Sequence, residues 1–275
     1  MIDRTPSVSA GESSPRARHD VTRIVRVATP VAPLLAEPRA AAPLTSQYLN
    51  GQHLGVIDER GDWVHVRGAD AYEGWTHVGY LARVSARAPT EERLSLGCIV
   101  RGATGHRRAL PLGALLDEGE SLLEGDVVPV AELSSHFPSE GSAIAGSAIR
   151  FFEGASYLWG GVTPWGADCS GLVQSIFALH GTRMPRDAGD QGRCGVEIAA
   201  DPESLVAADL LFFSDRDDGR ITHVAISMGH ARIVHLALGR GGYAVETLRG
   251  ETDDYGTALR TRIRFARRVL GGPPR

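Results

Sequence analysis

Residues 168–181 read DCSGLVQSIFALHG and contain the clearest helical pattern in the chain. Apolar side chains recur there at helical spacing and form one stripe, which consists of Leu172, Val173, Ile176, Phe177 and Leu179. Asp168 is a natural N-cap, because its carboxylate can accept hydrogen bonds from free backbone N–H groups, and Gly181 suits the C-terminal stop. The sequence therefore predicts a helix from Cys169 to His180 with one buried face.

On either side of this helix the chain has the pattern of an α+β domain. A shorter helix is expected over 143–152, followed by a loop rich in Gly and Trp over 157–161. After the main helix, short apolar runs predict successive strands at 209–213, 222–228, 232–238, 243–248 and 259–269. One helix followed by a run of adjacent strands is typical of α+β folds, so we expect such a domain over 141–275.

The N-terminal half has a different pattern. Residues 1–20 are rich in Ser, Pro, Arg and Asp, a composition that predicts a disordered tail. Residues 21–84 contain short apolar runs separated by turn residues, with a hairpin connection at 58–62, and predict a small β-barrel. Residues 85–140 repeat this pattern in weaker form, so a second, degenerate barrel is expected there.

The composition is that of a globular protein and argues against two classes of partner. The 275 residues carry a net charge of −4, and all 29 basic residues are Arg. Without an excess of positive charge, neither nucleic acid nor an anionic membrane surface is expected as a partner. No run approaches the roughly 18 apolar residues of a membrane span, and residues 1–20 lack the apolar core of an export signal. A cytoplasmic location is the resulting expectation.

Cys169 is a candidate nucleophile because of its position at the start of the main helix. Unpaired backbone N–H groups and the helix dipole favour a thiolate at such a position. The alternative is that Cys169 is a small buried apolar residue, which is the commoner fate of a free cysteine. Its neighbours Asp168, Ser170 and Gly171 are polar or small, and the position alone leaves the two interpretations about equal.

Two histidines favour the catalytic interpretation. His223 and His235 each lie six residues from Gly229, which is expected at the turn of a hairpin. A hairpin centred on Gly229 brings the two imidazoles directly opposite each other on one face of the sheet, with Cβ atoms about 5 Å apart. One imidazole can then act as the base of a cysteine nucleophile while the other orients it.

Two other chemistries use the same residues. Cys169, His223 and His235 offer three ligands for zinc, but no acidic or Cys-x-x-Cys element completes the ligand spacing. A redox pair of Cys169 with Cys194 lacks the Cys-x-x-Cys spacing of known redox motifs. We therefore expect neither a metal nor a cofactor.

The C-terminal half resembles the NlpC/P60 peptidases, which have a small papain-like core. The resemblance rests on five segments that occur in the family's order: 157–161, 168–174, 184–187, 209–213 and 222–226. The family's third polar residue is often a His twelve positions after the second, and His235 has that spacing from His223. Residues 62–66 and 71–75 resemble bacterial SH3 (SH3b) domains, which close with an aromatic-x-Gly-Trp segment.

The resemblance implies a cysteine peptidase with peptidoglycan stem peptides as its substrates. Cys169 would attack the carbonyl of the γ-D-Glu–L-diamino acid bond, with His223 as base and His235 as the orienting group. The further implied substrate-binding residues are Trp159, Tyr157 at the oxyanion, Asp168 and Ser170 at a free N-terminal amine, and Glu37 and Tyr72 closing that end of the groove. The alternatives are core packing for Tyr157, Trp159 and Tyr72 and a solvated loop position for Glu37. Such an enzyme would recycle murein peptides. The alternatives are a catalytically silent wall-binding protein and a cysteine-dependent acyltransferase on the same scaffold.

Overall fold

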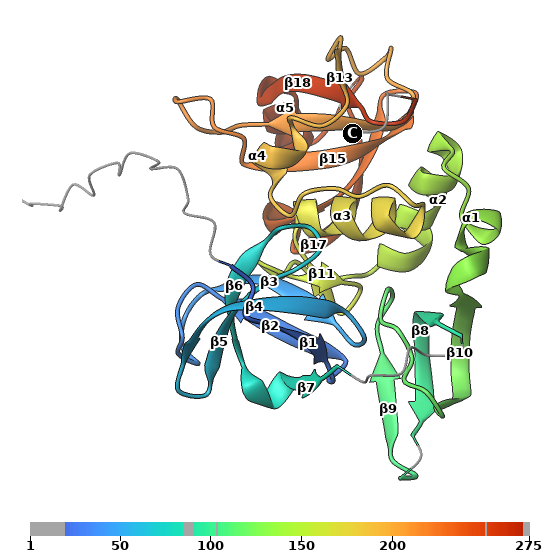
Figure 1. Cartoon of the computed structure of the whole chain (residues 1–275). Helices are drawn as coiled ribbons and strands as arrows, with labels where there is room; N and C mark the ends of the chain where they lie inside the picture. Colours follow the sequence, from blue (N-terminus) through green and yellow to red (C-terminus); the bar gives the residue numbers. More distant parts are fainter. Residues whose placement is uncertain (1–19, 85–90, 103, 251, 272–275) are drawn as a thin grey trace, which may run out of the picture.

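The structure is a computed structural model that describes residues 20–84, 91–102, 104–250 and 252–271. Of the predicted tail, all but Asp20 lies outside the described residues. Figure 1 shows three parts along the chain: a blue sheet, a green sheet, and a larger body in yellow to red that contains most of the helices. The domain boundaries expected from the sequence stay predictions.

The first part is a seven-stranded antiparallel sheet in the order β3-β2-β6-β5-β4-β1-β7. Alternate side chains of its strands pack into one core, as the period-2 pattern requires. The predicted connection at 58–62 joins β4 to β5, and Gly61 there adopts a φ of 60°, which glycine tolerates best. The strands are β1 Arg23–Val27, β2 Val31–Leu35, β3 Leu44–Leu49, β4 His53–Arg60, β5 Trp63–Arg67, β6 Glu73–His77 and β7 Leu81–Arg83, with the 3₁₀ turn η1 Val78–Tyr80.

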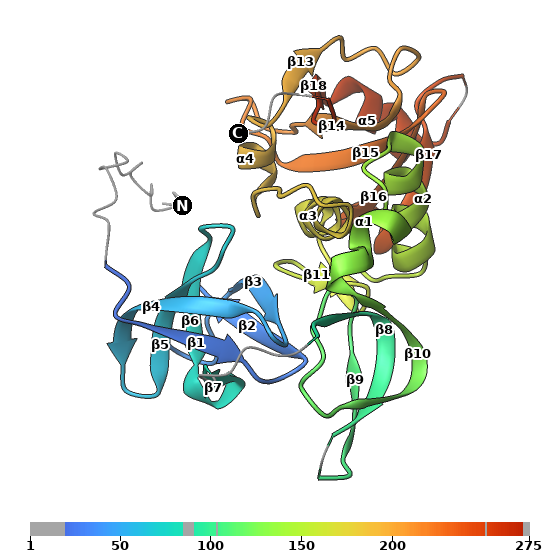
Figure 2. The same ribbon diagram turned by 45° about the vertical axis from the view of Figure 1, so that its right-hand side comes forward.

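The second part is a three-stranded sheet in the order β10-β8-β9, which lies beside the first sheet in Figures 1 and 2. Its strands are β8 Arg93–Arg101, β9 Arg107–Leu110 and β10 Ser121–Pro129. Its apolar side chains share a core with Leu49 of the first sheet and Val162 of the third part, so the three parts pack together. A second SH3b-like domain stays a prediction, because three strands are fewer than the seven of the first sheet.

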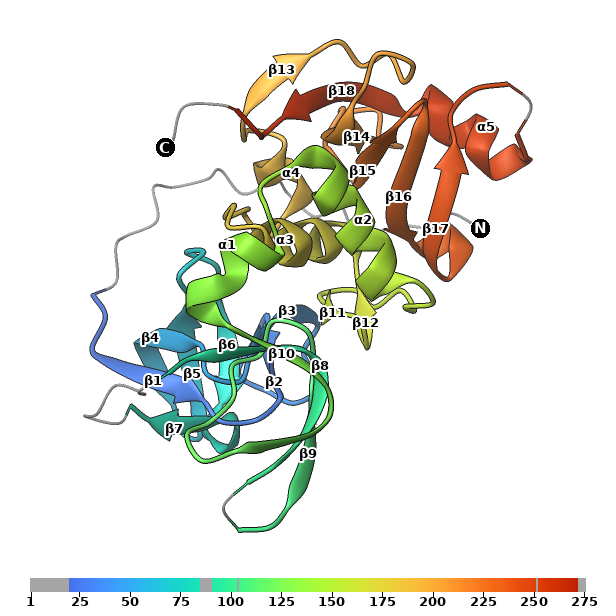
Figure 3. The ribbon, with the colours of Figure 1, turned by 90° about the vertical axis from the view of Figure 1, so that its right-hand side faces the viewer.

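The third part is a six-stranded sheet in the order β13-β18-β14-β15-β16-β17, with helices on both faces (Figure 3). Helices α2 and α3 cover one face, and α5 covers the other. The helices are α1 Leu133–His136, α2 Gly141–Phe152, α3 Cys169–Leu179, α4 Ala188–Gln191 and α5 Asp254–Thr261, with the 3₁₀ turns η2 Val130–Glu132 and η3 Leu238–Arg240. The six strands of the sheet are β13 Val196–Ile198, β14 Ala207–Phe213, β15 His223–Gly229, β16 Arg232–Ala237, β17 Gly242–Thr247 and β18 Ile263–Arg268, and β11 Val162–Thr163 and β12 Gly166–Ala167 form a separate two-stranded sheet. The predicted α+β class is confirmed.

Helix α3 begins and ends as the sequence predicts. The Asp168 side chain accepts from the backbone N–H of Gly171 at 2.8 Å, and Gly181 adopts a φ of 78° just after the helix. Gly171 also permits a close approach, since a Cβ built there would lie 2.1 Å from the carbonyl oxygen of Gly161. The loop before the helix can therefore pack directly against its first turn.

The predicted strand at 259–269 starts too early. Helix α5 extends to Thr261, and the strand β18 begins only at Ile263. The Asp253 side chain caps α5 by accepting from the backbone N–H of Gly256 at 2.8 Å. The alternation of Arg with apolar residues after this cap favoured a strand, and the helix was therefore missed. Within the described ranges, no helix is both long enough and apolar enough to cross a membrane.

Candidate active site

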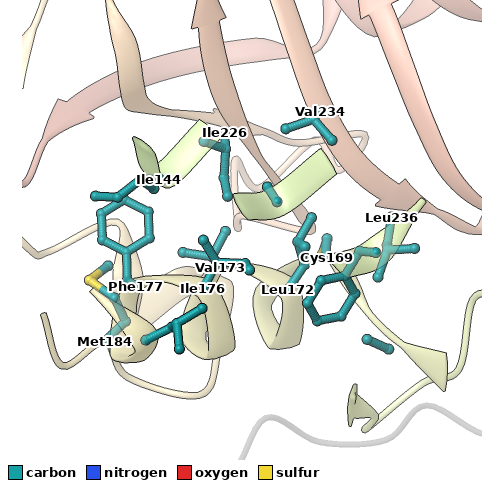
Figure 4. Close-up of a cluster of buried hydrophobic side chains, with 14 of the residues drawn as sticks. Ile144, Cys169, Leu172, Val173, Ile176, Phe177, Met184, Ile226, Val234 and Leu236 are labelled. Atoms are coloured by element: carbon teal, nitrogen blue, oxygen red, sulfur yellow. The ribbon is translucent and has the colours of Figure 1, made fainter. Parts of the chain in front are cut away.

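Cys169 lies at the point where helix α3 meets strand β15. Its side chain is only 6% exposed and belongs to the main apolar cluster, where Figure 4 shows it beside Leu172 and Leu236. The backbone N–H groups of Val224 and Ser170 face its sulfur. Because Val224 follows His223 directly, the thiol lies next to the residue that carries the first candidate imidazole.

The expectation that the Cys169 thiol is ionised is wrong for the protein without bound substrate. Burial, followed by the negative charge of Asp168, raises the pKa of the thiol to about 12. The N–H groups of Val224 and Ser170 and the charge of Arg186 act in the opposite direction without compensating. A helix start favours a thiolate only while solvent or positive charge offsets the cost of burial. Cys169 is therefore a neutral thiol at neutral pH and needs a base.

The two candidate histidines are in direct contact. Nε2 of His223 lies 2.8 Å from Nδ1 of His235, within hydrogen-bond distance, and the ring centroids are 4.9 Å apart. His235 is fully buried on β16, whereas His223, the first residue of β15, is half-buried. The predicted contact between the imidazoles on one face of the sheet is present.

The predicted pairing across the hairpin is wrong by two residues. Strand β15 pairs Ile226 with Val234, and this register brings Ala225 opposite His235. The turn is formed by His230 and Ala231, both at positive φ, and the register shifts just before it, between Ser227 and Gly229, so Gly229 is not the centre of the hairpin. A shift of two residues leaves both imidazoles on the same face, so they meet diagonally.

His223 is suited to accept a proton. Burial, and next the repulsion from His235, hold the pKa of His223 well below its usual value. The imidazole is therefore neutral at neutral pH. In the resting protein the Cys169 thiol and the His223 imidazole are therefore both uncharged.

Asp168 has a second partner besides the helix cap. Its carboxylate accepts from both terminal nitrogens of Arg186, at 2.6 and 3.0 Å, and from the backbone N–H of Gly160 at 2.9 Å. The Ser170 hydroxyl lies 3.2 Å from the same carboxylate and 2.9 Å from Arg186. Arg186 is 2% exposed and also reaches Ser46 of the first sheet, so this ion pair joins the two parts.

The first sheet contributes Tyr72 to the surroundings of the site. Burial raises the pKa of the Tyr72 hydroxyl, and the charges of Asp187, Arg186 and Asp168 act on it. Glu37 is exposed and pairs with Arg39 at 2.9 Å; the described contacts do not join it to the Asp168 group. Its assignment to the groove stays a prediction.

The loop before helix α3 carries the two aromatic candidates. Tyr157 is half-buried, and burial together with the charges of Cys169 and Asp168 raises the pKa of its hydroxyl. Trp159 is 67% exposed and therefore does not pack in the core. A Cβ built on Gly160, which has a φ of 80°, would lie 2.8 Å from Leu44, so this loop contacts the first sheet closely.

Sequence reasoning left two charged residues near the site without a role. Arg186 lies in the segment 184–187 but gave no local sign that it pairs with Asp168. Glu246 lies beyond His235 on β17, and only the register of that strand reveals the contact. Among the described residues, no group of three or more His, Cys, Asp or Glu side chains is arranged to hold a metal ion.

Comparisons with known proteins agree with this architecture. The model of the NlpC/P60 family matches residues 154–257, and that of the bacterial dipeptidyl-peptidase Sh3 domain matches residues 34–81. A γ-D-glutamyl-L-lysine dipeptidyl-peptidase of Bacillus subtilis is 39% identical over 240 residues, which cover 74% of this chain and 75% of that protein. A protein of the same name from Bacillus cereus is 29% identical over 233 residues, or 71% and 68% of the two chains.

A solved structure supports the fold over most of the chain. The crystal structure of an NlpC/P60 family protein from Bacillus cereus has a TM-score of 0.75 to this chain at 21% identity, and covers 90% of this chain and 100% of the other. The chain belongs to the NlpC/P60 family. It is a cysteine peptidase whose catalytic domain follows a bacterial SH3 domain.

Proposed function

We propose that the protein cleaves the γ-D-Glu–L-diamino acid bond of peptidoglycan-derived peptides, with Cys169 as nucleophile, His223 as base and His235 as the orienting group. The observation that carries this proposal is the contact between the half-buried His223 and the fully buried His235, with Val224, the residue after His223, facing the thiol. The printed names of the relatives, γ-D-glutamyl-L-lysine dipeptidyl-peptidases, support the choice of bond.

The chemistry follows from the neutral resting state. His223 takes the thiol proton as the sulfur attacks the scissile carbonyl, and later gives that proton to the leaving amine. The developing oxyanion would face the backbone N–H of Cys169, which in the first turn of α3 has no partner within the helix, and the Tyr157 hydroxyl is proposed as a second donor. Trp159, which is exposed on the adjoining loop, offers its ring to the substrate.

The Asp168 group supports a pocket for the free N-terminal amine of the substrate. In this proposal the ammonium group shares the Asp168 carboxylate with Arg186, which already donates to it, and the hydroxyls of Ser170 and Tyr72 are further acceptors. Glu37 of the first sheet completes the wall in this proposal. In intact wall the stem peptide is attached through this nitrogen, so a pocket of this kind selects released peptides. Recycling of such peptides in the cytoplasm is part of the same proposal.

Cleavage of L-Ala-γ-D-Glu-L-Lys and of its N-acetylated form tests the pocket. We expect release of lysine from the free tripeptide and a kcat/KM about 100-fold lower for the acetylated one, since a hydrogen bond to a charged group contributes about 1.5–3 kcal/mol. Chromatographic quantification of lysine measures both rates. Equal cleavage of the two peptides would refute the free-amine pocket and leave the peptidase assignment intact.

The pH dependence of kcat/KM tests the role of His223. The base must be neutral to accept a proton, and its pKa lies below the ordinary value of 6.5. Activity is therefore expected to stay constant as the pH falls through 6.5 and to decline only at more acidic pH. Circular dichroism at each pH controls for unfolding. A decline centred at or above 6.5 in folded protein contradicts a buried, neutral base.

A further inference from the structure

A buried carboxylate lies behind the second imidazole. Glu246 on β17 is 6% exposed, and its Oε1 lies 3.8 Å from Nε2 of His235. In the described part of the chain this nitrogen has no hydrogen-bond partner, although it is fully buried. The register pairs Ile233 with Glu246 and His235 with Ala244, so the carboxylate and the imidazole are diagonal neighbours on one face of the sheet.

The carboxylate is held in place and held ionised. Arg240 donates to both oxygens of Glu246, at 2.7 and 3.1 Å. Burial opposes ionisation of Glu246, but His235 and Arg240 together outweigh it and lower the pKa of the carboxyl. Arg240 also pairs with Asp253 at 2.7 Å and lies over the ring of Tyr255, 4.4 Å from its centroid, so its own position does not depend on Glu246 alone.

The positions of the ring protons on His235 and His223 follow from which atoms can donate a hydrogen bond and which can only accept one. An ionised carboxylate only accepts, so the proton of His235 belongs on Nε2, which faces Glu246. Nδ1 of His235 is left as an acceptor, and at 2.8 Å it accepts a hydrogen bond from the Nε2–H group of His223, which keeps its proton. His223 then has a bare Nδ1, and this is the atom left to receive the thiol proton.

We infer that Glu246 is a positioning residue that fixes the tautomers of both histidines and stabilises the imidazolium formed when Cys169 loses its proton. This inference rests on the proposed roles of Cys169, His223 and His235. In the protein without substrate, the Glu246 carboxylate lies 3.8 Å from Nε2 of His235 and acts on it through its charge. We expect this distance to shorten to that of a hydrogen bond when positive charge develops on the two imidazoles.

The variant Glu246→Gln removes the charge and keeps the size of the side chain. Arg240 retains Asp253, so no buried cation is left without a partner. We expect kcat/KM for the tripeptide to fall about 10- to 100-fold through kcat, with KM unchanged, because remote partners of functional histidines typically contribute that much. Glu197→Gln, an exposed carboxylate on β13 paired with Arg267, makes the same charge change and is expected to leave the rate unchanged.

The ¹⁵N chemical shifts of the histidine rings give a readout that does not depend on activity or on a variant. In the unaltered protein we expect a single tautomer for each ring, with the proton on Nε2 of His235 and on Nε2 of His223. A proton on Nδ1 of His235 overturns the inference, and so does an unchanged kcat in folded Glu246→Gln. Activity that survives in Cys169→Ala would instead overturn the proposed function. The proton positions measured on the two histidines would still be valid, because that measurement does not depend on activity.

Discussion

Replacement of Cys169 by alanine is expected to lower kcat/KM for the tripeptide at least about 10⁴-fold. Loss of the nucleophile in a hydrolase removes the covalent route altogether and leaves only binding and the oxyanion site, which by themselves give little turnover. Cys169→Ser is expected to be nearly as inactive, because a neutral imidazole whose pKa is already depressed does not ionise a serine hydroxyl to a useful extent. The initial rate of lysine release at substrate concentrations well below KM measures kcat/KM for both variants.

The control for this experiment is Cys194→Ala. Cys194 is partly exposed and follows helix α4, and it has no part in the proposed chemistry. The rate of this variant is expected to equal that of the unaltered protein. Circular dichroism separates loss of chemistry from loss of fold, and alanine removes only the sulfur atom of the cysteine side chain, so Cys169→Ala is expected to stay folded. A folded Cys169→Ala protein that retains full turnover rules out residue 169 as the nucleophile.

Replacement of Arg186 by methionine is expected to destabilise the protein by about 3–5 kcal/mol, since breaking a buried ion pair leaves an uncompensated charge. The Asp168 carboxylate would lose two hydrogen bonds from the guanidinium and stay buried at the start of helix α3. The link from Arg186 to Ser46 of the first sheet would be lost as well. Urea denaturation followed by tryptophan fluorescence measures the change in the free energy of unfolding.

Two further variants distinguish buried charge from lost packing. Arg216→Met breaks the exposed pair of Arg216 with Asp218 and is expected to have little measurable effect. The double variant Asp168→Asn with Arg186→Met removes both charges, and asparagine keeps an acceptor for the helix cap. It is expected to recover most of the lost stability. If it is as unstable as Arg186→Met alone, packing rather than charge explains the loss.

Local patterns were sufficient to predict much of the C-terminal half. The apolar stripe from Leu172 to Leu179, with Asp168 before it and Gly181 after it, gave helix α3 because capping and helical periodicity act over a few residues. Strands β14 to β17 began and ended within two residues of their predicted bounds. The face shared by His223 and His235 was also predictable, since alternation along a strand survives an even shift of register.

The hairpin register and the charge state of the thiol were not predictable in the same way. The tight turn at His230 and Ala231 depends on how β15 and β16 fit their neighbours, and no turn signal in the sequence marked it. The pKa of Cys169 depends on burial, and that is set by helix α3 packing on the sheet rather than by the position of Cys169 in its own helix.

The amino-acid sequence by itself determined the start of helix α3 at Cys169 and the common face of His223 and His235, because each depends on residues close together in the chain. Only the tertiary structure decided which buried charges meet. Arg186 reaches both Asp168 and Ser46, and Glu246 reaches His235, across distances in sequence that no local pattern spans. In a medium of low polarity an ionised group persists only beside such a partner, so the electrostatics of this site are a property of the fold.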